Sequence, residues 1–321
     1  MFTLGKPNAR ILVVRLGAMG DIIHALPAVA SLKHSYSGSR LTWIVEPKWA
    51  ALLQDNPFVD RMAFLDRTSL SGLIRSWRSL HAERYDLAID FQGLLKSALV
   101  ASAAHPDCIF GFHHTQVRER AAALFYSNKA LSHSTHVVDR NLDLAAAAGA
   151  ANPLHAFPLP NGLPEGDLPP GDFVLTSPFA GWRSKQWPVE HYQALASQLR
   201  REFGIPLVVN APPGTPMPEI PEAISHFSRL PGLIHATRRA AAVVGVDSGP
   251  LHLAAALAKP GVAIFGPTDP ARNGPYGGSL RVLRSPAAAT TYKRGTEIHE
   301  SMLGVSPVEV CEALRSVFAV R

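Results

Sequence analysis

Cysteine is scarce in this sequence, with only Cys108 and Cys311 among 321 residues. Two isolated cysteines indicate neither a disulfide framework nor a metal site, and they fit a reducing compartment. Groups of His, Cys, Asp and Glu with the spacing of metal ligands are missing too. We therefore expect no tightly bound metal.

Long apolar runs are also missing. No stretch reaches the roughly 18 uninterrupted apolar residues that a membrane-spanning helix needs. The opening residues MFTLGKPNAR lack the apolar run of a signal peptide, so we expect none. The P-loop, the G-x-S-x-G nucleophile turn and the G-x-G-x-x-G dinucleotide fingerprint do not occur, and we predict no cofactor.

Charged residues make up only 17 % of the chain and apolar residues 47 %, which is a globular composition. The net charge of +6 fits either an ordinary solvated surface or an anionic partner such as a nucleotide, a nucleic acid or anionic lipid. No long Lys/Arg run and no nucleic-acid motif is visible, so we do not expect a nucleic-acid partner.

Short apolar runs alternate with helix-like segments in the first half of the chain. The runs predict strands at residues 11–14, 41–45, 61–65 and 87–91, and residues 118–149 are predicted to be mostly helical. Strands that alternate with helices at this spacing indicate a parallel sheet with helices on both faces.

A proline- and glycine-rich stretch at 152–172 then breaks both helix and strand, after which the alternation restarts. Strands are predicted at 173–178, 206–210, 242–248 and 261–266, with helices at 191–204 and 249–258. We predict two doubly wound, Rossmann-like α/β domains, 1–157 and 173–321, joined by a linker at 158–172. The last helix is free to pack back on the first domain. Because open α/β sheets bind ligands at the carboxyl ends of their strands, we expect the site in a central cleft that both domains face.

The string RLGAMGDIIHALP follows the first predicted strand. Gly17 and Gly20 allow a tight turn and a close approach to a ligand, and Asp21 falls near the start of the next helix. An Asp at this position is ordinarily a helix cap. An acid at a strand end can also be a general base, and both interpretations stay open here.

The string VVGVDSGPLHLAAAL contains a second strand-to-helix corner. Asp247 ends the strand, Ser248 and Gly249 make the turn, and the free amides of the helix start favour a pyrophosphate. His252 lies in the first helical turn, near that position. A cap for Asp247 and a packed histidine are the alternatives.

The loop SPFAGWRSKQWP carries Arg183 and Lys185 between a strand and a helix, on the same sheet edge as Asp247. A lysine there can neutralise phosphate charge as a leaving group departs, although a lone lysine is more often simply solvated.

Two further strand-end loops carry polar groups. DLAIDFQGLLKSA offers Gln92 and Lys96 to a sugar or phosphate, or as parts of a helix cap with a solvated face. FGPTDPARNGPYG offers Thr268 and Asp269 as polar contacts, or as ordinary turn residues.

Taken together and in this order, RLGAMGDIIHALPA, DFQGLLKSA, KQWP, GVDSGPLHLAAAL and FGPTDPARNGPYG resemble the ADP-heptose:lipopolysaccharide heptosyltransferases of glycosyltransferase family 9, which have the GT-B fold. The strings DFQGLLKSA and HVVDRNLDLAAAAG favour heptosyltransferase I over heptosyltransferase II within that family. The resemblance covers residues 11–278.

The resemblance implies an inverting, metal-independent transfer of heptose from ADP-heptose to the Kdo of Kdo-lipid A, in lipopolysaccharide inner-core synthesis. The first domain of such enzymes binds the acceptor and the second binds the donor. Asp21 matches the general base and Lys185 matches a lysine on the donor phosphates. The resemblance also implies the donor-site residues Asp247, Ser248, Gly249, Leu251 and His252, and we add Arg183 and Thr268 as candidates. The candidates on the acceptor side are Gly17, Gly20, Arg61, Arg67, Gln92, Lys96, Arg118 and Arg120.

The acceptor implies work at the cytoplasmic face of the inner membrane with peripheral attachment to it. One feature departs from the family pattern: the loop NAPPGTPMPEIPEA replaces a glycine-rich turn followed by a glutamate that contacts the ribose, and neither Glu219 nor Glu222 aligns with that glutamate. Heptosyltransferase II, another family 9 transferase, a GT-B epimerase and an inactive nucleotide-sugar-binding protein are the alternatives.

Overall fold

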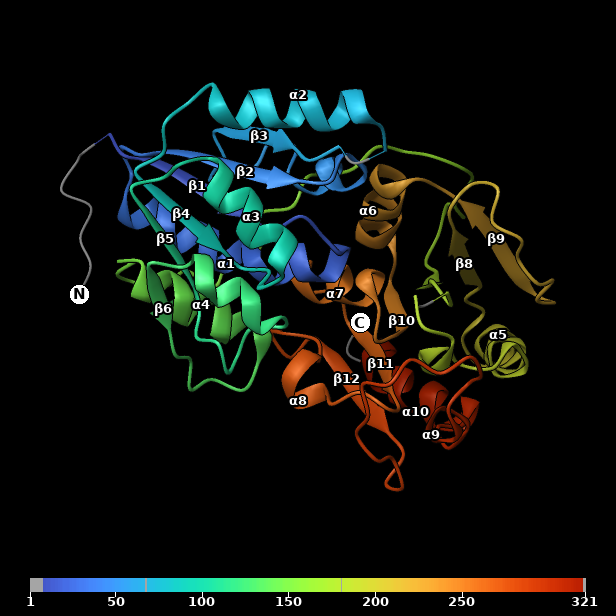
Figure 1. Ribbon diagram of the computed structural model, residues 1–321. Helices are drawn as coiled ribbons and strands as arrows, with labels where there is room; N and C mark the ends of the chain where they lie inside the picture. Colours follow the sequence, from blue (N-terminus) through green and yellow to red (C-terminus); the bar gives the residue numbers. More distant parts are fainter. Residues whose placement is uncertain (1–7, 67, 180, 320–321) are drawn as a thin grey trace. The chain divides into compact units, whose positions relative to one another are not determined.

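The computed structural model describes residues 8–66, 68–179 and 181–319. The chain forms two compact units, divided between Pro160 and Asn161. Each unit is built on a six-stranded sheet in which the paired strands run parallel (Figure 1).

The first unit has its strands in the order β3-β2-β1-β4-β5-β6. Helices α1 and α4 pack together on one face, and α2, α3 and η2 cover the other (Figure 1). Its elements are β1 (Arg10–Val14), α1 (Met19–Ser35), β2 (Arg40–Val45), η1 (Pro47–Leu52), β3 (Arg61–Phe64), α2 (Leu70–His81), β4 (Leu87–Asp90), α3 (Leu95–Ala103), β5 (Cys108–Phe112), η2 (Arg120–Phe125), β6 (Asn128–Ala130) and α4 (Val137–Ala147).

The second unit repeats this topology, with the order β12-β11-β10-β7-β8-β9. Helix α10 packs on α5 and β11 of the same unit. The elements are β7 (Val174–Thr176), η3 (Arg183–Lys185), α5 (Val189–Phe203), β8 (Leu207–Ala211), β9 (Ala223–Phe227), α6 (Leu230–Arg239), β10 (Ala242–Val246), α7 (Gly249–Ala256), β11 (Gly261–Phe265), α8 (Pro270–Asn273), β12 (Leu280–Arg284), α9 (Glu300–Leu303) and α10 (Pro307–Phe318).

The central strands are buried on both sides, which explains their continuous apolar sequences. In β1 the four residues from Ile11 to Val14 are fully buried, and in β10 the same holds for nearly every residue. Helices cover both faces of a parallel sheet, so an inner strand has no polar face to show. The predicted fold class, two Rossmann-like α/β units, is confirmed by the two parallel sheets and the helices that cover them.

The prediction that residues 118–149 are mostly helical is wrong in part. Only α4 is an α-helix in that range; a 3₁₀ turn, η2, and an edge strand, β6, precede it. The run RAAALF has helical composition, but at six residues the 3₁₀ segment ends at Phe125, before the chain extends to pair with β5.

Residues of the predicted linker lie against the second unit. The Leu163 amide donates to the carbonyl of Pro231, and the carbonyl of Glu165 contacts His226. Gly162 has φ +76°, and an added Cβ would meet the backbone of α6 there. The glycine is needed at this position because the chain passes so close to the helix.

Both sheets have a topological switch point, where the strand order reverses. It lies between β1 and β4 in the first unit and between β7 and β10 in the second. Ligands of open α/β sheets bind outside the carboxyl ends of the strands at such points. Four of the loops chosen from the sequence follow these four strands.

Candidate functional site

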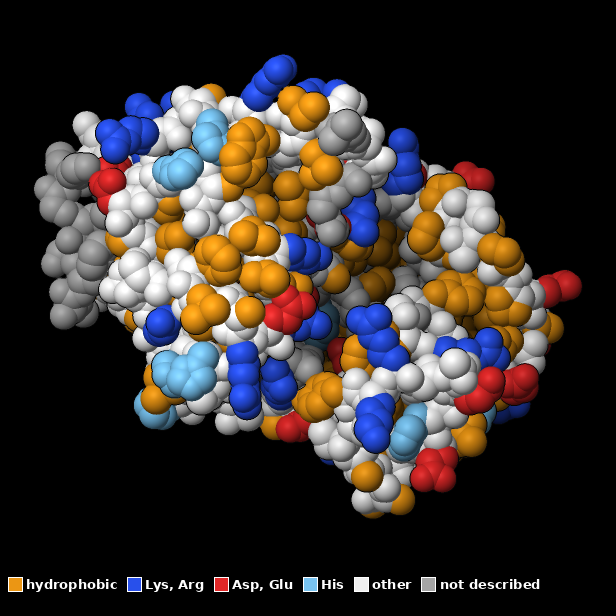
Figure 2. Space-filling view, in the orientation of Figure 1, with side chains coloured by type: hydrophobic (Ala, Val, Ile, Leu, Met, Phe, Trp, Pro, Cys, Tyr) orange, Lys and Arg blue, Asp and Glu red, His pale blue; other side chains and the backbone are white. Residues whose placement is uncertain are grey.

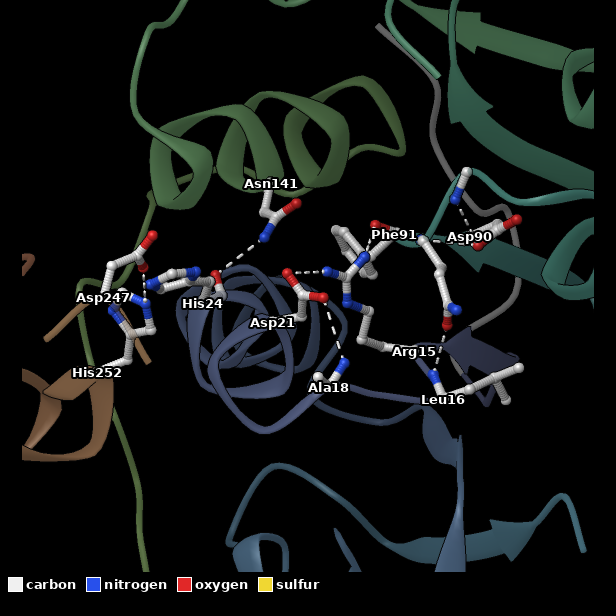
Figure 3. Close-up of polar contacts among 12 residues, drawn as sticks. Arg15, Leu16, Ala18, Asp21, His24, Asp90, Phe91, Asn141, Asp247 and His252 are labelled. Carbon is white, nitrogen blue, oxygen red and sulfur yellow. Dashed lines mark hydrogen bonds and ion pairs between the residues drawn. The ribbon is translucent and has the colours of Figure 1, made fainter. Parts of the chain in front are cut away.

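The loop after β1 holds an ion pair between Arg15 and Asp21. Arg15 Nη2 lies 2.6 Å from Asp21 Oδ1, and Arg15 also donates to the carbonyl of Phe91 beyond β4 (Figure 3). The Arg15 side chain is 5 % exposed and that of Asp21 33 % exposed. A buried guanidinium tied to two strand ends therefore fixes one oxygen of a carboxylate that solvent still reaches.

Asp21 is also the third residue of α1. Its Oδ2 accepts a hydrogen bond of 3.2 Å from the amide of Ala18, the N-cap residue. An acid in the first helical turn is favoured by the helix dipole. Asp21 is therefore not the N-cap residue itself, but its side chain accepts from the N-cap amide. This contact does not conflict with a chemical role, because the long bond leaves Oδ2 available to a stronger donor.

Gly17 and Gln92 fix the path of the same corner. A Cβ on Gly17 would lie 2.8 Å from Nε1 of Trp49, so only glycine fits beside that ring. Gln92 is buried, and its Oε1 accepts a hydrogen bond of 2.8 Å from the amide of Leu16. This bond joins the loops after β1 and β4. Gly20 is buried inside the first turn of α1.

Asp90 at the end of β4 is fully buried and organises its turn. It accepts hydrogen bonds from the Gln92 amide, the Ser97 hydroxyl and the Tyr126 hydroxyl at 2.8, 2.8 and 2.6 Å. Burial raises the pKa of Asp90, while these bonds oppose that rise. Burial and the Asp90 charge raise the pKa of Tyr126, so the phenol stays protonated and donates.

The basic candidates of the first unit separate into two places. The segment with Arg118 and Arg120 is bonded to the turn after β4 through the Glu119 amide and the Gly93 carbonyl, and Lys96 lies in the first turn of α3 beside it. Arg61 begins β3 at the opposite, amino edge of the sheet, where it pairs with Glu83 at 2.7 Å. Arg67 lies outside the described residues.

The second unit gathers three predicted site residues around the carboxylate of a fourth, Asp247. Asp247 Oδ2 accepts from Lys185 Nζ at 2.6 Å and from Thr268 Oγ1 at 2.7 Å, and its Oδ1 lies 3.4 Å from His252 Nε2 (Figure 3 shows Asp247 with His252). The loops after β7, β10 and β11 therefore meet at Asp247, which is itself buried.

This cluster determines the charge of Asp247. Burial alone would raise the pKa of Asp247, but hydrogen bonding and charge from His252, together with Lys185, outweigh it and hold that pKa well below the usual range. The carboxylate is therefore ionised at any physiological pH. It orients Lys185 and His252 and is not available as a proton acceptor.

The start of α7 lies directly after Asp247. The amides of Leu251 and His252 both bond to the Ser248 carbonyl, while Gly249 precedes them and Pro250 has no N–H. Among the described residues, the buried Oγ of Ser248 has no hydrogen-bond partner. The side chain of Leu251 lies in the core against Gly245, so only its backbone borders this helix start.

Trp182 is a feature that sequence reasoning missed. Lys185 Nζ lies 4.2 Å and Arg294 Cζ 5.1 Å from its ring centroid, so the indole makes cation–π contacts with both side chains. Arg183 is exposed and turns to Glu297, with Nε and Oε2 3.8 Å apart. Arg15 was missed too; a charged residue placed directly after a buried strand was the available signal.

Neither a metal-ligand cluster nor a membrane-spanning helix is found in the part of the chain that is described. There, no three His, Cys, Asp or Glu side chains gather as a metal ion requires. Likewise, no helix formed by these residues is long and apolar enough to span a bilayer.

Two Rossmann-like units in one chain are the architecture of GT-B glycosyltransferases. The sequence pattern of Glycosyltransferase family 9 (heptosyltransferase) matches residues 73–302. The chain belongs to this family, and the predicted enzyme class, a glycosyltransferase, is confirmed.

Individual relatives agree with this assignment. Lipopolysaccharide heptosyltransferase 1 of Escherichia coli K12 is 30% identical over 312 residues, which cover 86% of this chain and 94% of the relative. Lipopolysaccharide heptosyltransferase 2 of Salmonella typhimurium is 25% identical, over 97% of this chain and 99% of the relative. The solved structure of E. coli heptosyltransferase WaaC with ADP has a TM-score of 0.78 at 25% identity, and covers 96% of this chain and 99% of its own.

Proposed function

We propose that the protein transfers L-glycero-D-manno-heptose from ADP-heptose to the Kdo of Kdo-lipid A, with inversion and without a metal. Family membership supports heptosyl transfer, and the E. coli relative carries the name lipopolysaccharide heptosyltransferase 1. A related structure solved with ADP supports an adenosine diphosphate leaving group. The first unit binds the acceptor and the second binds the donor.

The observation that carries the proposal is the half-exposed carboxylate of Asp21 held by the buried Arg15. A general base needs a carboxylate whose orientation is fixed and whose free oxygen reaches substrate. Arg15 occupies Oδ1, and Oδ2 makes only the long bond to Ala18. Asp21 therefore has an oxygen to accept the proton of an acceptor hydroxyl.

The reaction then needs a stabilised leaving group. As the acceptor oxygen bonds to the anomeric carbon, the bond from that carbon to the β-phosphate oxygen breaks, and ADP carries away the electron pair. Lys185, fixed by Asp247, and the start of α7 with the Ser248 hydroxyl offset the charge that develops on the diphosphate. Since these groups are already ordered, no metal is required.

Acceptor-dependent release of ADP tests the proposal. ADP-heptose is incubated with and without deacylated Kdo-lipid A, each with and without EDTA. Release that needs the acceptor and survives EDTA is expected. Consumption of the donor without acceptor would favour an epimerase instead, and loss of activity that only a divalent ion restores would contradict metal-independent transfer.

Heptosyltransferase II is the second candidate, because a relative of that name matches nearly the whole chain. The two candidates differ in the acceptor. Heptosyltransferase I uses Kdo as the acceptor, whereas heptosyltransferase II uses the product of that first transfer. Presenting both deacylated acceptors to the protein in parallel separates them, and transfer to the Kdo acceptor is the expected result.

A lipid-linked acceptor also gives the place of work. We propose peripheral association with the cytoplasmic face of the inner membrane. The net charge of +6 supports this, since each Lys or Arg near an anionic surface contributes about 1 kcal/mol of attraction.

A further inference from the structure

Helix α2 carries its largest apolar side chains on its exposed side. Leu73, Ile74 and Trp77 are 42, 44 and 54 % exposed. A surface helix ordinarily turns such residues toward the core. In α2 these three side chains instead remain exposed to solvent.

The buried side of α2 explains the helix orientation. Gly72 lies against the Asp66 side chain, where a Cβ would clash, and the Ser76 hydroxyl donates to the Gly72 carbonyl while accepting from the Asp66 amide. Leu80 completes this side and is almost fully buried. Close packing through small residues fixes the helix so that the bulky apolar residues point outward.

The apolar surface continues beyond α2. Helix α3 packs beside α2 and exposes Leu95 and Leu99, and η2 packs on α3 and exposes Leu124. Figure 2 shows hydrophobic side chains gathered over the region of α2 and α3. We call these six residues, Leu73, Ile74, Trp77, Leu95, Leu99 and Leu124, the apolar face. Contiguous apolar surface of this kind marks an interaction site.

Cationic side chains lie beside the apolar face, and one of them, Arg75, has its Nη2 3.6 Å from Oδ2 of Asp66. Arg75 and Arg78 lie on α2 and Lys96 lies on α3, and neither helix contains an Asp or Glu. Arg118 and Arg120 flank Glu119, whose carboxylate accepts from the Leu95 amide at the start of α3. A basic, apolar surface helix matches the pattern of helices that lie in the interface of anionic membranes.

We infer that the apolar face docks the protein on an anionic lipid surface. The inference rests on the proposed function, since a lipid-linked acceptor is presented at such a surface. A second copy fits less well, because an isologous contact would bring two copies of the same cationic surface together. The face also reaches Lys96, so docking brings the carboxyl edge of the first sheet to the lipid headgroups.

Vesicle co-sedimentation of the full chain tests this. The probes are vesicles of phosphatidylcholine alone and of equal parts phosphatidylcholine and phosphatidylglycerol. The parent is expected to bind the anionic vesicles at least about tenfold more tightly, and the combined variant Leu73→Ser, Ile74→Ser, Trp77→Ser to lose roughly tenfold or more. Arg75→Gln with Arg78→Gln is expected to lose a similar factor, more at low salt than at high salt.

A matched control comes from the second unit. Leu163, Leu303 and Val308 are as exposed as the three α2 residues, and their combined change to Ser should leave vesicle binding as in the parent. If the combined α2 variant fails to fold, Trp77→Phe remains. The anionic vesicles should shift the tryptophan emission of the parent to the blue, and this variant should lose part of that shift.

Three outcomes overturn the inference. They are equal binding of the parent to both vesicles, parent-like binding by the α2 variant, and a parent dimer in sedimentation velocity that the α2 variant abolishes. Transfer to the deacylated, soluble acceptor distinguishes this inference from the proposed function. The α2 variant should retain that transfer, and its loss would assign the α2 residues to the acceptor site. A parent that binds vesicles but transfers no heptose would reject only the proposed function.

Discussion

The two switch points of this chain contain similar residues, but these residues differ in how far they are exposed to solvent. Each has an aspartate and a basic residue at the carboxyl ends of a sheet with the same strand order. In the first unit the cation, Arg15, is buried and Asp21 is half exposed. In the second unit both partners are largely buried, and Asp247 is surrounded by Lys185, Thr268 and His252.

This difference in exposure separates two kinds of carboxylate chemistry. A carboxylate with one strong partner and a solvent-facing oxygen can take up a proton during a reaction. A carboxylate with three partners and a strongly lowered pKa instead works as a fixed anion that positions other groups. The contrast predicts that changes at Asp21 affect chemistry, whereas changes at Asp247 affect donor binding and stability.

The largest effect is expected for Asp21→Asn. Asparagine keeps the size of the side chain, but its single oxygen can accept from only one of Arg15 and the Ala18 amide, and it cannot accept the proton. Transfer should fall by about a thousandfold, while binding of ADP by the second unit, measured by calorimetry, should stay close to that of the parent.

Asp60→Asn provides the matched control. Asp60 has a similarly exposed side chain and pairs with Lys33 at 2.7 Å, but it precedes β3 at the amino edge of the same sheet. Its variant should transfer heptose like the parent. An Asp21→Asn enzyme with parental turnover would remove the general base from the mechanism.

Lys185→Ala is expected to have the next largest effect. Without this cation, the charge on the departing diphosphate is less well offset, and transfer should slow by roughly a hundredfold with weaker donor binding. Steady-state kinetics with ADP-heptose measure both effects. Lys33→Ala removes an equally buried lysine from an ion pair of the first unit and should leave the kinetics unchanged. Equal losses in the two variants would mean that Lys185 matters only for stability.

The sequence predicted the centre of each sheet better than its edges. Inner strands such as β1 and β10 are continuous apolar runs because helices cover both of their faces. Strands β6, β9 and β12 are edge strands that mix polar with apolar residues, so the same criterion did not find them. Strand β5 was missed as well, since Gly111 interrupts its short apolar run.

The candidate site, too, was predicted only in part from the sequence. The rule that ligands bind at strand ends singled out the loops of Asp21, Lys185 and Asp247 in the sequence, and the family resemblance then supplied the roles of these residues. It did not predict that Arg15 fixes Asp21, because the orientation of Arg15 depends on the Phe91 carbonyl, 76 positions away. Nor did it predict that Lys185 and Thr268 share one oxygen of Asp247, since those contacts join loops of three different strands.

Asp247→Asn should destabilise the second unit in a pH-dependent way. The variant leaves Lys185 without its counterion, which should lower the free energy of unfolding by about 3 kcal/mol at neutral pH. The pKa of Asp247 is lowered in the folded protein, so its contribution is complete above the unfolded-state pKa of about 4. As pH falls below about 4, only the unfolded chain gains the proton, and the difference between parent and variant should shrink.

Urea unfolding at several pH values between neutral and acid, followed by circular dichroism, measures this difference. Asp60→Asn is again the control, because its carboxylate is more exposed and should contribute less at neutral pH. A difference between parent and Asp247→Asn that stays constant down to acid pH would mean that Asp247 is not held ionised by its partners.

The smallest effect is expected for Ser248→Ala. This change should not lower the stability of the ligand-free protein, but it should weaken the binding of ADP. The buried Oγ of Ser248 has no hydrogen-bond partner among the described residues, so its removal should leave the ligand-free protein as stable or slightly more stable. If that hydroxyl donates to the diphosphate, ADP affinity should fall by about tenfold, as for one lost hydrogen bond to a charged group. Thermal unfolding with and without ADP reads both effects in one experiment, because ADP should then raise the Tm of the variant less than that of the parent. Equal shifts would place the diphosphate away from the start of α7, and the resemblance between the two switch points would then end at their topology.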